Sequence, residues 1–288
     1  MPENIIVFRR EIETLKVSES RIEKNRDMKV RHFHDSIELY ILLEGTRYFF
    51  VDRTIHVIEE HTAILIPPGQ IHKTSTYGDD PRHRRFLLQL SREGSEGILR
   101  DTFAMGFDEF CQALSGPVRI SDEKWPEFLA LMEKIKTAFS GETPYLPMVK
   151  LLAHELLFMY TEELGRIRAQ KKESRDTAAL PSDTLSSIQQ VIEYLNDRYM
   201  EDIHLDDLAR RFFISRAYLT RSFRQMTGVT VVQYLTVVRI RRACQLLTET
   251  DEPVTEIARQ CGFSNTTYFE NVFRRLRGMT PSRYRRRS

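Results

Sequence analysis

YLTRSFRQMTGVTVVQY, residues 218–234, and YFENVFRRLRGMTPSRY, residues 268–284, are two versions of one pattern in this 288-residue chain. The offset between them is 50 residues, and six pairs of positions match in type: Tyr218 and Tyr268, Phe223 and Phe273, Arg224 and Arg274, Gly228 and Gly278, Thr230 and Thr280, and Tyr234 and Tyr284. Such self-similarity indicates that one supersecondary unit occurs twice.

Each copy is predicted to form a helix, a short turn and a second helix. Upstream, LDDLARRF (205–212) matches VTEIARQC (254–261) at an offset of 49, so the second turn is one residue longer. Small residues, Ala209 and Ala258, stand where the two helices are expected to cross closely. Gly262 is expected to supply a positive φ in the second turn. The expected N-caps are Asp206 and Thr255 for the first helices and Ser215 and Ser264 for the second helices.

The second helix of each copy has an apolar stripe and a polar face. Leu219, Phe223 and Met226 form the expected core stripe in copy one, and Phe269, Phe273 and Leu276 form it in copy two. The outward residues, which are the candidate DNA contacts, are Arg216, Ala217, Thr220, Arg221 and Arg224 in copy one and Thr266, Thr267, Glu270, Asn271 and Arg274 in copy two. Short polar and Arg side chains on a second helix suit entry into a major groove. The competing interpretation is a plain helical bundle with an Arg-rich surface.

The segment between the copies has no helix breaker from Val231 to Glu249. As one helix, these 19 residues span roughly 28 Å. That length is close to one turn of B-DNA, about 34 Å, so the second helices of the two copies, here called the reading helices, could reach successive major grooves.

Charge separates the chain into two parts. Residues 183–288 hold 17 Arg, no Lys and 12 acidic residues, a net charge of +5, whereas the remainder has a net charge of −3. A basic C-terminal third favours double-stranded DNA as a partner. No run of about 18 apolar residues and no secretory h-region is present, and Cys111, Cys244 and Cys261 are far apart. These features predict a cytoplasmic protein with no membrane partner.

Residues from about 185 to 287 resemble the DNA-binding domain of the AraC/XylS family of bacterial transcription regulators. The family signature reads here VTEIARQCGFSNTTYFENVFRRLRGMTPSRYRR. The resemblance implies seven helices, two helix-turn-helix units joined by a long helix, and base contacts from both second helices. Family members commonly carry Arg where Asn271 stands, and Arg221 occupies the equivalent place in copy one. Copy one is therefore expected to dominate the DNA affinity.

The N-terminal part predicts the short strands of a β-sandwich or β-barrel before the helices, so the chain is expected to be α+β. Short strand-like runs, such as IELYILLE and RRFLLQL, alternate with turn signals up to about residue 115. Apolar residues with helical spacing follow. The expected domains are a barrel at 1–120, a helical dimerisation segment at 121–168, a flexible linker at 169–184 and the all-α double helix-turn-helix domain at 185–288.

The stretch HFHDSIELYILLEG, residues 32–45, carries the candidate ligand residues. His32, His34, Glu38 and Tyr40 share one face of an unbroken strand because side chains alternate along it. His72 follows a Pro-Gly turn. The spacing resembles the two cupin motifs, in which His32, His34, Glu38 and His72 are the metal ligands. Two residues depart from the second motif: His61 replaces its opening glycine, and Thr76 replaces an asparagine.

Three interpretations of these side chains stay open. They hold a divalent metal that orients a ligand, they hydrogen-bond a sugar or similar polyol without metal, or they pack in a barrel that binds nothing. The metal is the one cofactor suggested. No Walker loop, GxGxxG or nucleophile elbow is present.

Together these patterns predict a DNA-binding regulator that responds to a small-molecule effector. The resemblance favours a carbohydrate effector, a homodimer and a contact with RNA polymerase. The alternative is a metal-dependent cupin enzyme tethered to a DNA-binding domain.

Overall fold

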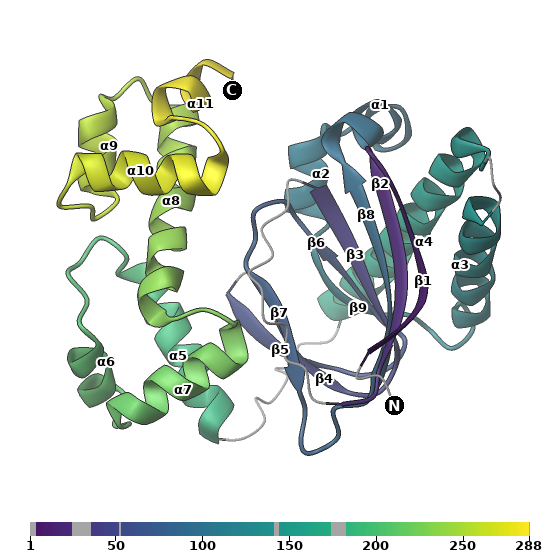
Figure 1. Cartoon of the computed structure of the whole chain (residues 1–288), viewed down its shortest axis with the longest axis horizontal. Coiled ribbons are helices and arrows are strands. Elements are labelled where there is room, and N and C mark those ends of the chain that lie inside the picture. Colours follow the sequence, from purple (N-terminus) through teal and green to yellow (C-terminus); the bar gives the residue numbers. More distant parts are fainter. Residues whose placement is uncertain (1–3, 25–35, 52, 141–143, 174–182, 288) are drawn as a thin grey trace. The chain divides into compact units, whose positions relative to one another are not determined.

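The chain divides into two compact units, and the main boundary between them along the sequence falls near residue 180 (Figure 1). The first unit contains all of the strands of the large sheet and helices α1 to α4, and the second contains helices α5 to α11. The computed structural model describes residues 4–24, 36–51, 53–140, 144–173 and 183–287. In these ranges no helix is both long enough and apolar enough to cross a membrane.

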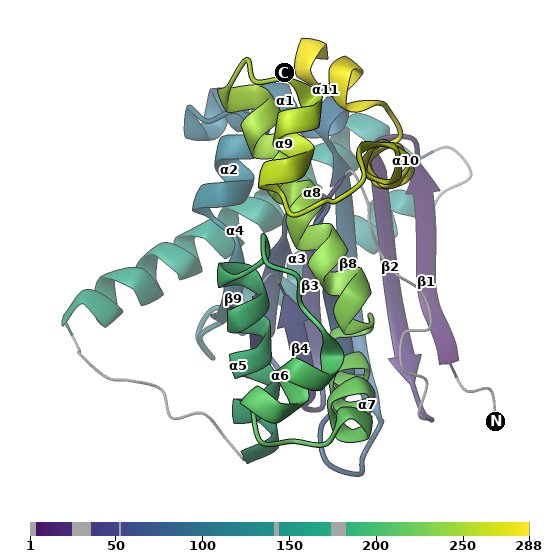
Figure 2. The ribbon, with the colours of Figure 1, turned by 90° about the vertical axis from the view of Figure 1, so that its left-hand side faces the viewer.

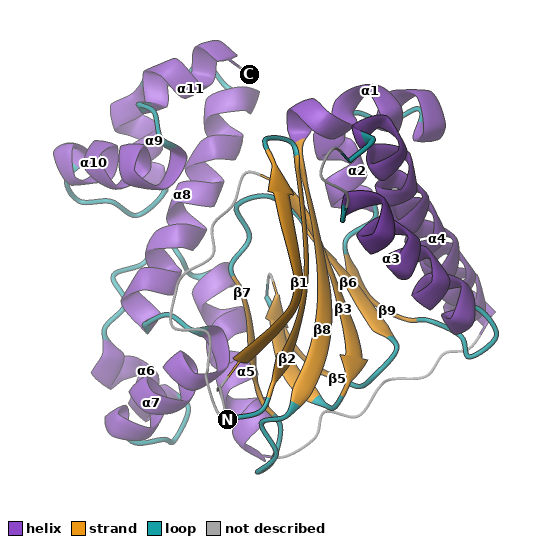
Figure 3. Cartoon of the chain, turned by 45° about the vertical axis from the view of Figure 1, so that its right-hand side comes forward, coloured by secondary structure: helices purple, strands orange, loops and turns teal. Residues whose placement is uncertain are grey.

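Two antiparallel sheets form the barrel of the first unit (Figure 3). The larger sheet has the strand order β1-β2-β8-β3-β6-β9, and the smaller has the order β5-β4-β7. The strands are β1 (Asn4–Ile12), β2 (Leu15–Ile22), β3 (Ser36–Glu44), β4 (Arg47–Val51), β5 (Thr54–Ile58), β6 (Thr62–Ile66), β7 (His72–Thr76), β8 (His83–Ser91) and β9 (Gly116–Arg119). The cupin-like fold expected from the sequence is confirmed.

Strand β3 shows how alternation divides the large sheet into two faces. Ile37, Leu39 and Ile41 belong to the core beneath the helices. Tyr40 and Leu42 belong to a second cluster, which includes residues of β4, β5, β6 and β8 and lies between the two sheets. We call the second side of the large sheet the inward face. Its side chains come from alternate positions because the side-chain period of a strand is two.

Four helices accompany the sheets: α1 (Arg92–Phe103), α2 (Phe107–Ala113), α3 (Trp125–Phe139) and α4 (Leu146–Glu173). Helices α3 and α4 pack side by side, and their apolar residues join the core against the large sheet. The sequence analysis expected α3 and α4 but missed α1 and α2. The N-cap of α1, Ser91, was a usable signal, because its Oγ accepts a hydrogen bond from the Gly94 amide at 3.1 Å.

His61 keeps the backbone conformation of the glycine that it replaces. Its φ is 66°, in the left-handed region that favours glycine. The ring stacks on Trp125 with centroids 4.2 Å apart, and Nδ1 lies 3.3 Å from an Asp122 carboxylate oxygen. These contacts offset the cost of the left-handed backbone.

Helix α4 extends into the segment that the sequence predicted as a flexible linker. Helix α4 continues to Glu173, five residues past the predicted boundary at residue 168, and α5 begins at Asp183. Residues 166–173 contain good helix formers and neither Gly nor Pro, so the helix has no local reason to stop. The rest of the predicted linker, 174–182, lies outside the described residues.

The second unit is built around one long helix. Its helices are α5 (Asp183–Asp197), α6 (Leu205–Arg211), α7 (Arg216–Thr227), α8 (Val231–Glu249), α9 (Val254–Gln260), α10 (Thr266–Arg277) and α11 (Pro281–Arg287). The bounds of α8 are those predicted from the sequence. Thr230 begins it with a capping box that includes Gln233. Helices α6 and α7 lie beside one end of α8, and α9 and α10 lie beside the other (Figures 1 and 2).

Arg239, at the middle of α8, ties the two halves of this unit together. Its Nε donates to the Tyr199 carbonyl at 2.7 Å, and its Nη2 donates to the Glu201 carbonyl at 2.8 Å. Gly262, in the turn between α9 and α10, has φ 79°. A Cβ there would lie 2.9 Å from the Tyr199 and Met200 carbonyl oxygens and 3.0 Å from Arg239 Nε. The turn therefore requires glycine for both conformation and space.

The equivalent position in copy one is Phe213, which also has a positive φ, 54°, but a side chain that is 97% exposed. We therefore expect opposite sensitivities at the two turns. Gly262→Ala should lower the free energy of unfolding by at least about 2 kcal/mol, because the left-handed strain of about 1–2 kcal/mol adds to the clash. Phe213→Gly should change it by less than about 1 kcal/mol, because relief of strain offsets the added freedom of the unfolded chain.

Chemical denaturation of both variants and the wild type measures this difference. Equal losses at the two positions would show that the packing of Gly262 against the carbonyls is unimportant.

Candidate functional site

The two helix-turn-helix units share the same backbone hydrogen bonds. The Ile214 amide donates to the Ala209 carbonyl and the Phe263 amide donates to the Ala258 carbonyl, both at 3.0 Å. Ala209 and Ala258 are buried, as expected where two helices approach closely. The second turn is one residue longer, also as predicted, since four residues separate α6 from α7 and five separate α9 from α10.

Three of the four predicted N-caps are wrong. Ser215 caps α7, and its side chain accepts a hydrogen bond from the Tyr218 amide. Asn265, not Ser264, caps α10 by accepting from the Tyr268 amide at 2.9 Å. His204 and Pro253 precede α6 and α9, so Asp206 and Thr255 lie inside the first turn. The error at the start of α10 follows from the longer second turn, which moves the cap by one residue.

The structure places the candidate DNA contacts on the outside of α7 and α10. The core stripes are buried as predicted at Leu219, Phe223 and Met226, and at Phe269 and Phe273, while Leu276 is half-buried. The exposed candidates are Arg216, Ala217, Thr220, Arg221, Arg224, Thr267, Glu270, Asn271 and Arg274; Thr266 is half-buried. This separation leaves a polar surface on each second helix that is free of core packing.

The arginines of the two outward faces differ in their contacts. Arg216 pairs with Asp206 at 3.0 Å, and Arg274 donates to Asn271 Oδ1 at 3.4 Å. Arg221 forms neither a hydrogen bond nor an ion pair with any residue that the structure describes. A guanidinium without a protein partner can contact a base or a phosphate without first breaking a bond. Copy one therefore has the more available cation.

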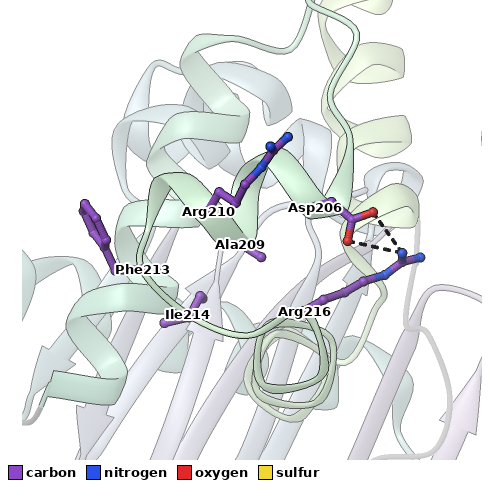
Figure 4. A pocket seen from close by; sticks show the side chains of 6 residues that line it. All are labelled: Asp206, Ala209, Arg210, Phe213, Ile214 and Arg216. Carbon is purple, nitrogen blue, oxygen red and sulfur yellow. Dashed lines mark hydrogen bonds and ion pairs between the residues drawn. The ribbon is translucent and has the colours of Figure 1, made fainter.

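A shallow hollow lies beside the start of α7 (Figure 4). Its lining comes from α6, the turn and α7: Asp206, Ala209, Arg210, Phe213, Ile214 and Arg216. Both of its arginines have carboxylate partners, since Arg210 pairs with Asp207 and Arg216 with Asp206. The hollow therefore adds no free positive charge to the outward face.

The sequence analysis missed one exposed aromatic residue on the outward surface. Tyr268 lies in the first turn of α10 and is 53% exposed. Its ring centroid lies 6.2 Å from that of Phe263. Its match with half-buried Tyr218 in the repeat suggested a core role, so the repeat pattern concealed its exposure.

In the first unit, Glu38 and His72 come together from different sheets. Glu38 Oε1 lies 3.7 Å from His72 Nε2, and each side chain is 2% exposed. His72 Nδ1 lies 3.1 Å from the Gln70 carbonyl, which fixes Nδ1 as the donor and points Nε2 toward Glu38. Gln89, which the sequence analysis missed, donates from Nε2 to Glu38 Oε2 at 2.5 Å.

Tyr40 lies on the same inward face as Glu38. Its ring packs edge-on against Phe49, with centroids 4.9 Å apart, and burial raises the pKa of its hydroxyl. His32 and His34 lie outside the described residues, so their predicted convergence with Glu38 and His72 stays a prediction.

Of the four predicted metal ligands, the structure describes Glu38 and His72. The other two predicted ligands, His32 and His34, lie outside the described residues, so the metal interpretation stays a prediction. The described ranges contain no group of three or more His, Cys, Asp or Glu side chains placed to hold a metal ion. Buried Glu38 and His72 and half-buried Gln89 together form a set of hydrogen-bonding groups, which also suits a polar organic ligand.

Two protein-family models match this chain. A model of a helix-turn-helix domain matches residues 208–287, and a model of the AraC-like ligand binding domain matches residues 17–134. The chain belongs to the AraC family of transcriptional regulators.

Curated AraC-family relatives match along most of their length. The HTH-type transcriptional activator RhaR of Mannheimia succiniciproducens is 26% identical over 258 residues, covering 89% of this chain and 87% of the relative. The arabinose operon regulatory protein of Salmonella typhimurium is 29% identical over 226 residues, covering 77% and 73%. The solved DNA-binding domain of AdpA, in complex with a target DNA, is 32% identical and covers 35% of this chain and 91% of that chain, with a TM-score of 0.34.

These AraC-family relatives are transcriptional regulators, and this chain is likewise a regulator rather than an enzyme. The alternative of a cupin enzyme tethered to DNA is therefore wrong. The family assigns DNA binding to the second unit and small-molecule binding to the first.

The different contacts of Arg221 and Asn271 generate a prediction about the two AraC-type reading helices. Arg221→Ala should weaken binding to a selected promoter fragment by about 1–3 kcal/mol, the usual value of an Arg–guanine contact. Asn271→Ala should cost less, because Asn271 already shares a hydrogen bond with Arg274. Fluorescence anisotropy at one salt concentration measures both losses.

The matched control is Arg198→Ala, which removes an exposed arginine that pairs with Glu201 on α5's C-terminal side. It should leave the affinity unchanged. A greater loss at Asn271 than at Arg221 would contradict the dominance of copy one.

Proposed function

We propose that this chain binds promoter DNA as a homodimer and that a sugar-like molecule, held between the two sheets of its first unit, changes the DNA sites that it occupies. The family membership supports DNA binding and an effector. The identity of the effector class, the dimer and the response are the parts that we propose.

The DNA-binding part rests above all on α8. Two helix-turn-helix units with solvent-exposed outward faces flank one unbroken helix of 19 residues, roughly 28 Å long. This length is compatible with two contacts on the same side of DNA, about one helical turn apart. The net charge of +5 over residues 183–288 favours the phosphate backbone as the first point of contact.

The sugar-like effector is supported by the chemistry of the inward face. A polyol presents many hydroxyl groups, and a carboxylate, an imidazole and an amide can each bond to them. Glu38 and His72, which are buried, and Gln89, which is half-buried, provide these three groups within one cluster. The aromatic rings of Tyr40 and Phe49 lie on the same side and provide apolar contact area.

The homodimer is supported by an apolar stripe on α4. Met148, Leu151 and Phe158 are 44%, 60% and 43% exposed, and their spacing places them on one side of the helix. The core residues Val149, Ala153 and Leu156 lie on the opposite side, facing the sheet. Exposed apolar side chains grouped on one side of a helix are typical of a protein interface. A second copy of α4 matches this row in chemistry.

The effector acts by changing the relative populations of different arrangements of the dimer. A ligand that binds one arrangement of the dimer more tightly than another shifts the equilibrium toward it, by no more than the difference in affinity. A contact with RNA polymerase stays a prediction without an assigned surface. A DNA-binding function is consistent with the predicted cytoplasmic location.

The DNA-binding proposal predicts a steep salt dependence. Residues 183–288, produced alone, should bind promoter DNA recovered from genomic fragments, and the logarithm of the affinity should fall linearly with the logarithm of the salt concentration as counterions are released. Anisotropy titrations between 50 and 200 mM salt, values typical of such measurements, test this expectation. A folded fragment whose binding is absent or indifferent to salt would refute it.

The dimer proposal predicts that one charge on the stripe separates the subunits. Leu151→Glu should convert the full chain from dimer to monomer, because a carboxylate at the centre of an apolar interface is left without a partner. Light scattering after size-exclusion chromatography measures the mass. Met200→Glu, which changes another exposed apolar residue outside the stripe, is the control and should remain dimeric. A dimer that survives Leu151→Glu places the interface elsewhere.

A further inference from the structure

The inward face is accessible along strand β8. This strand lies between β2 and β3, and its opposite face, with Phe86, Leu88 and Leu90, is fully buried under the helices. The inward residues Arg85, Leu87 and Gln89 are nevertheless half-buried. These inward side chains are therefore partly exposed to solvent, whereas the side chains of the opposite face are not.

Two arginines bring positive charge to this accessible side. Arg85 comes from β8, and its guanidinium carbon lies 6.0 Å from the centre of the Tyr40 ring. Arg47 comes from β4 in the opposite sheet, is 2% exposed, and donates to Thr76 Oγ1 at 3.3 Å and the Pro81 carbonyl at 3.4 Å. Both positive charges act on the buried Tyr40 hydroxyl, since each opposes the rise of its pKa.

The neighbouring histidine adds no further positive charge near neutral pH. His83, on the same strand as Arg85, is buried, and burial together with the charges of Arg47 and Arg85 lowers its pKa to about 4. Its Nδ1 donates to the Pro81 carbonyl at 2.9 Å. The imidazole is therefore neutral, and the positive charge beside it is that of the two guanidinium groups of Arg47 and Arg85.

Arg85 forms no ion pair with any carboxylate in the part of the chain that the structure describes. Glu38, the acid that shares the inward face, lies near His72 and accepts a short hydrogen bond from Gln89. A half-buried guanidinium next to an aromatic ring retains a large attraction for an anion, because water screens it incompletely.

Hydroxyl groups flank Arg85 in the sheet register. Ser20 of β2 pairs directly with Arg85, and Ser18 pairs with Leu87, so both lie on the inward face. Both serines are half-buried. An arginine fork with adjacent hydroxyl donors is an arrangement that binds a carboxylate, since the planar guanidinium can donate two parallel hydrogen bonds to it.

Arg85, which would bind a carboxylate, and the Glu38 cluster, which would bind hydroxyl groups, lie about the length of one monosaccharide apart. Tyr40, beneath the Arg85 guanidinium, and Glu38 are two residues apart on β3, a step of about 7 Å. A single sugar ring that carries a carboxylate at one end can therefore contact Arg85 and the Glu38 cluster together.

We propose that the effector is a sugar acid whose carboxylate binds Arg85, Ser18 and Ser20 and whose hydroxyl groups bind Glu38, His72 and Gln89. This inference rests on the proposed sensing function of the first unit. It goes further by distinguishing acids from neutral sugars: a neutral sugar leaves the positive charge of Arg85 without an anion, whereas an acid neutralises it.

Isothermal titration calorimetry on the full-length protein tests this choice. The probes are D-galacturonate and D-glucuronate, their neutral counterparts D-galactose and D-glucose, and D-glucose 6-phosphate. At least one uronate should bind at least about 10-fold more tightly than its neutral counterpart, the lower end of what a charge-assisted hydrogen bond contributes. Equal or tighter binding of the neutral sugar, preference for the phosphate, or no binding of either uronate overturns the proposal.

Variants of Arg85 identify the residue responsible. Arg85→Gln should weaken uronate binding about 10- to 100-fold and leave the neutral sugar unchanged, and Arg85→Lys should restore part of the preference. Arg82→Gln is the matched control, because Arg82 is exposed and pairs with Asp80. Equal weakening by Arg82→Gln and Arg85→Gln overturns the assignment. If Arg85→Gln fails to fold, the comparison of uronate and neutral sugar on the wild type decides alone.

A DNA titration on the same protein separates this inference from the proposed function. A protein that binds promoter DNA and responds to a neutral sugar retains the sensing function and loses the sugar-acid assignment. A protein that binds no DNA loses the regulatory proposal itself, whatever the calorimetry shows.

Discussion

The hydrogen bonds of Arg239 in the middle of α8 are the constraint on which the DNA-binding unit depends. The guanidinium holds the carbonyls of Tyr199 and Glu201, and burial lowers the pKa of this arginine. The same carbonyl of Tyr199 lies against Gly262 in the turn of the second helix-turn-helix. One side chain thus connects the segment before α6, the long helix and the turn before α10. Buried backbone carbonyls need such donors, and a rigid α8 transmits their positions to both reading helices.

That shared support allows the two units to differ where they face DNA. Both keep the turn hydrogen bond to an alanine and the left-handed residue that begins the turn. Their outer surfaces differ more: copy one offers Arg221, which has no partner among the residues that the structure describes, and copy two offers Asn271 bonded to Arg274. Surface changes of this kind cost little stability, because the core stripes beneath them remain intact. Specificity can therefore vary while the fold stays constant.

The barrel separates its charges between its two faces. On the helix side, buried Glu19 pairs with Arg84 and with Lys136 of α3, so the charges there neutralise one another and hold the helix to the sheet. On the inward face, Arg85 has no carboxylate partner among the described residues. Adjacent residues of β8, Arg84 and Arg85, thus have opposite roles because successive side chains point to opposite faces.

The sequence by itself determined the repeated unit, the extent of α8, the left-handed turn at Gly262 and the meeting of Glu38 with His72, because local periodicity, turn chemistry and motif spacing specify these features. The true cap at Asn265, helices α1 and α2, and the left-handed His61 were decided by tertiary structure. His61 is tolerated because Trp125 and Asp122, distant in the sequence, pack against its ring. The other polar groups of the inward face were equally hidden. Gln89, which bonds to Glu38, and Arg85 reach this face through strand pairing, and the order of strands in a sheet is a long-range property that no local pattern encodes.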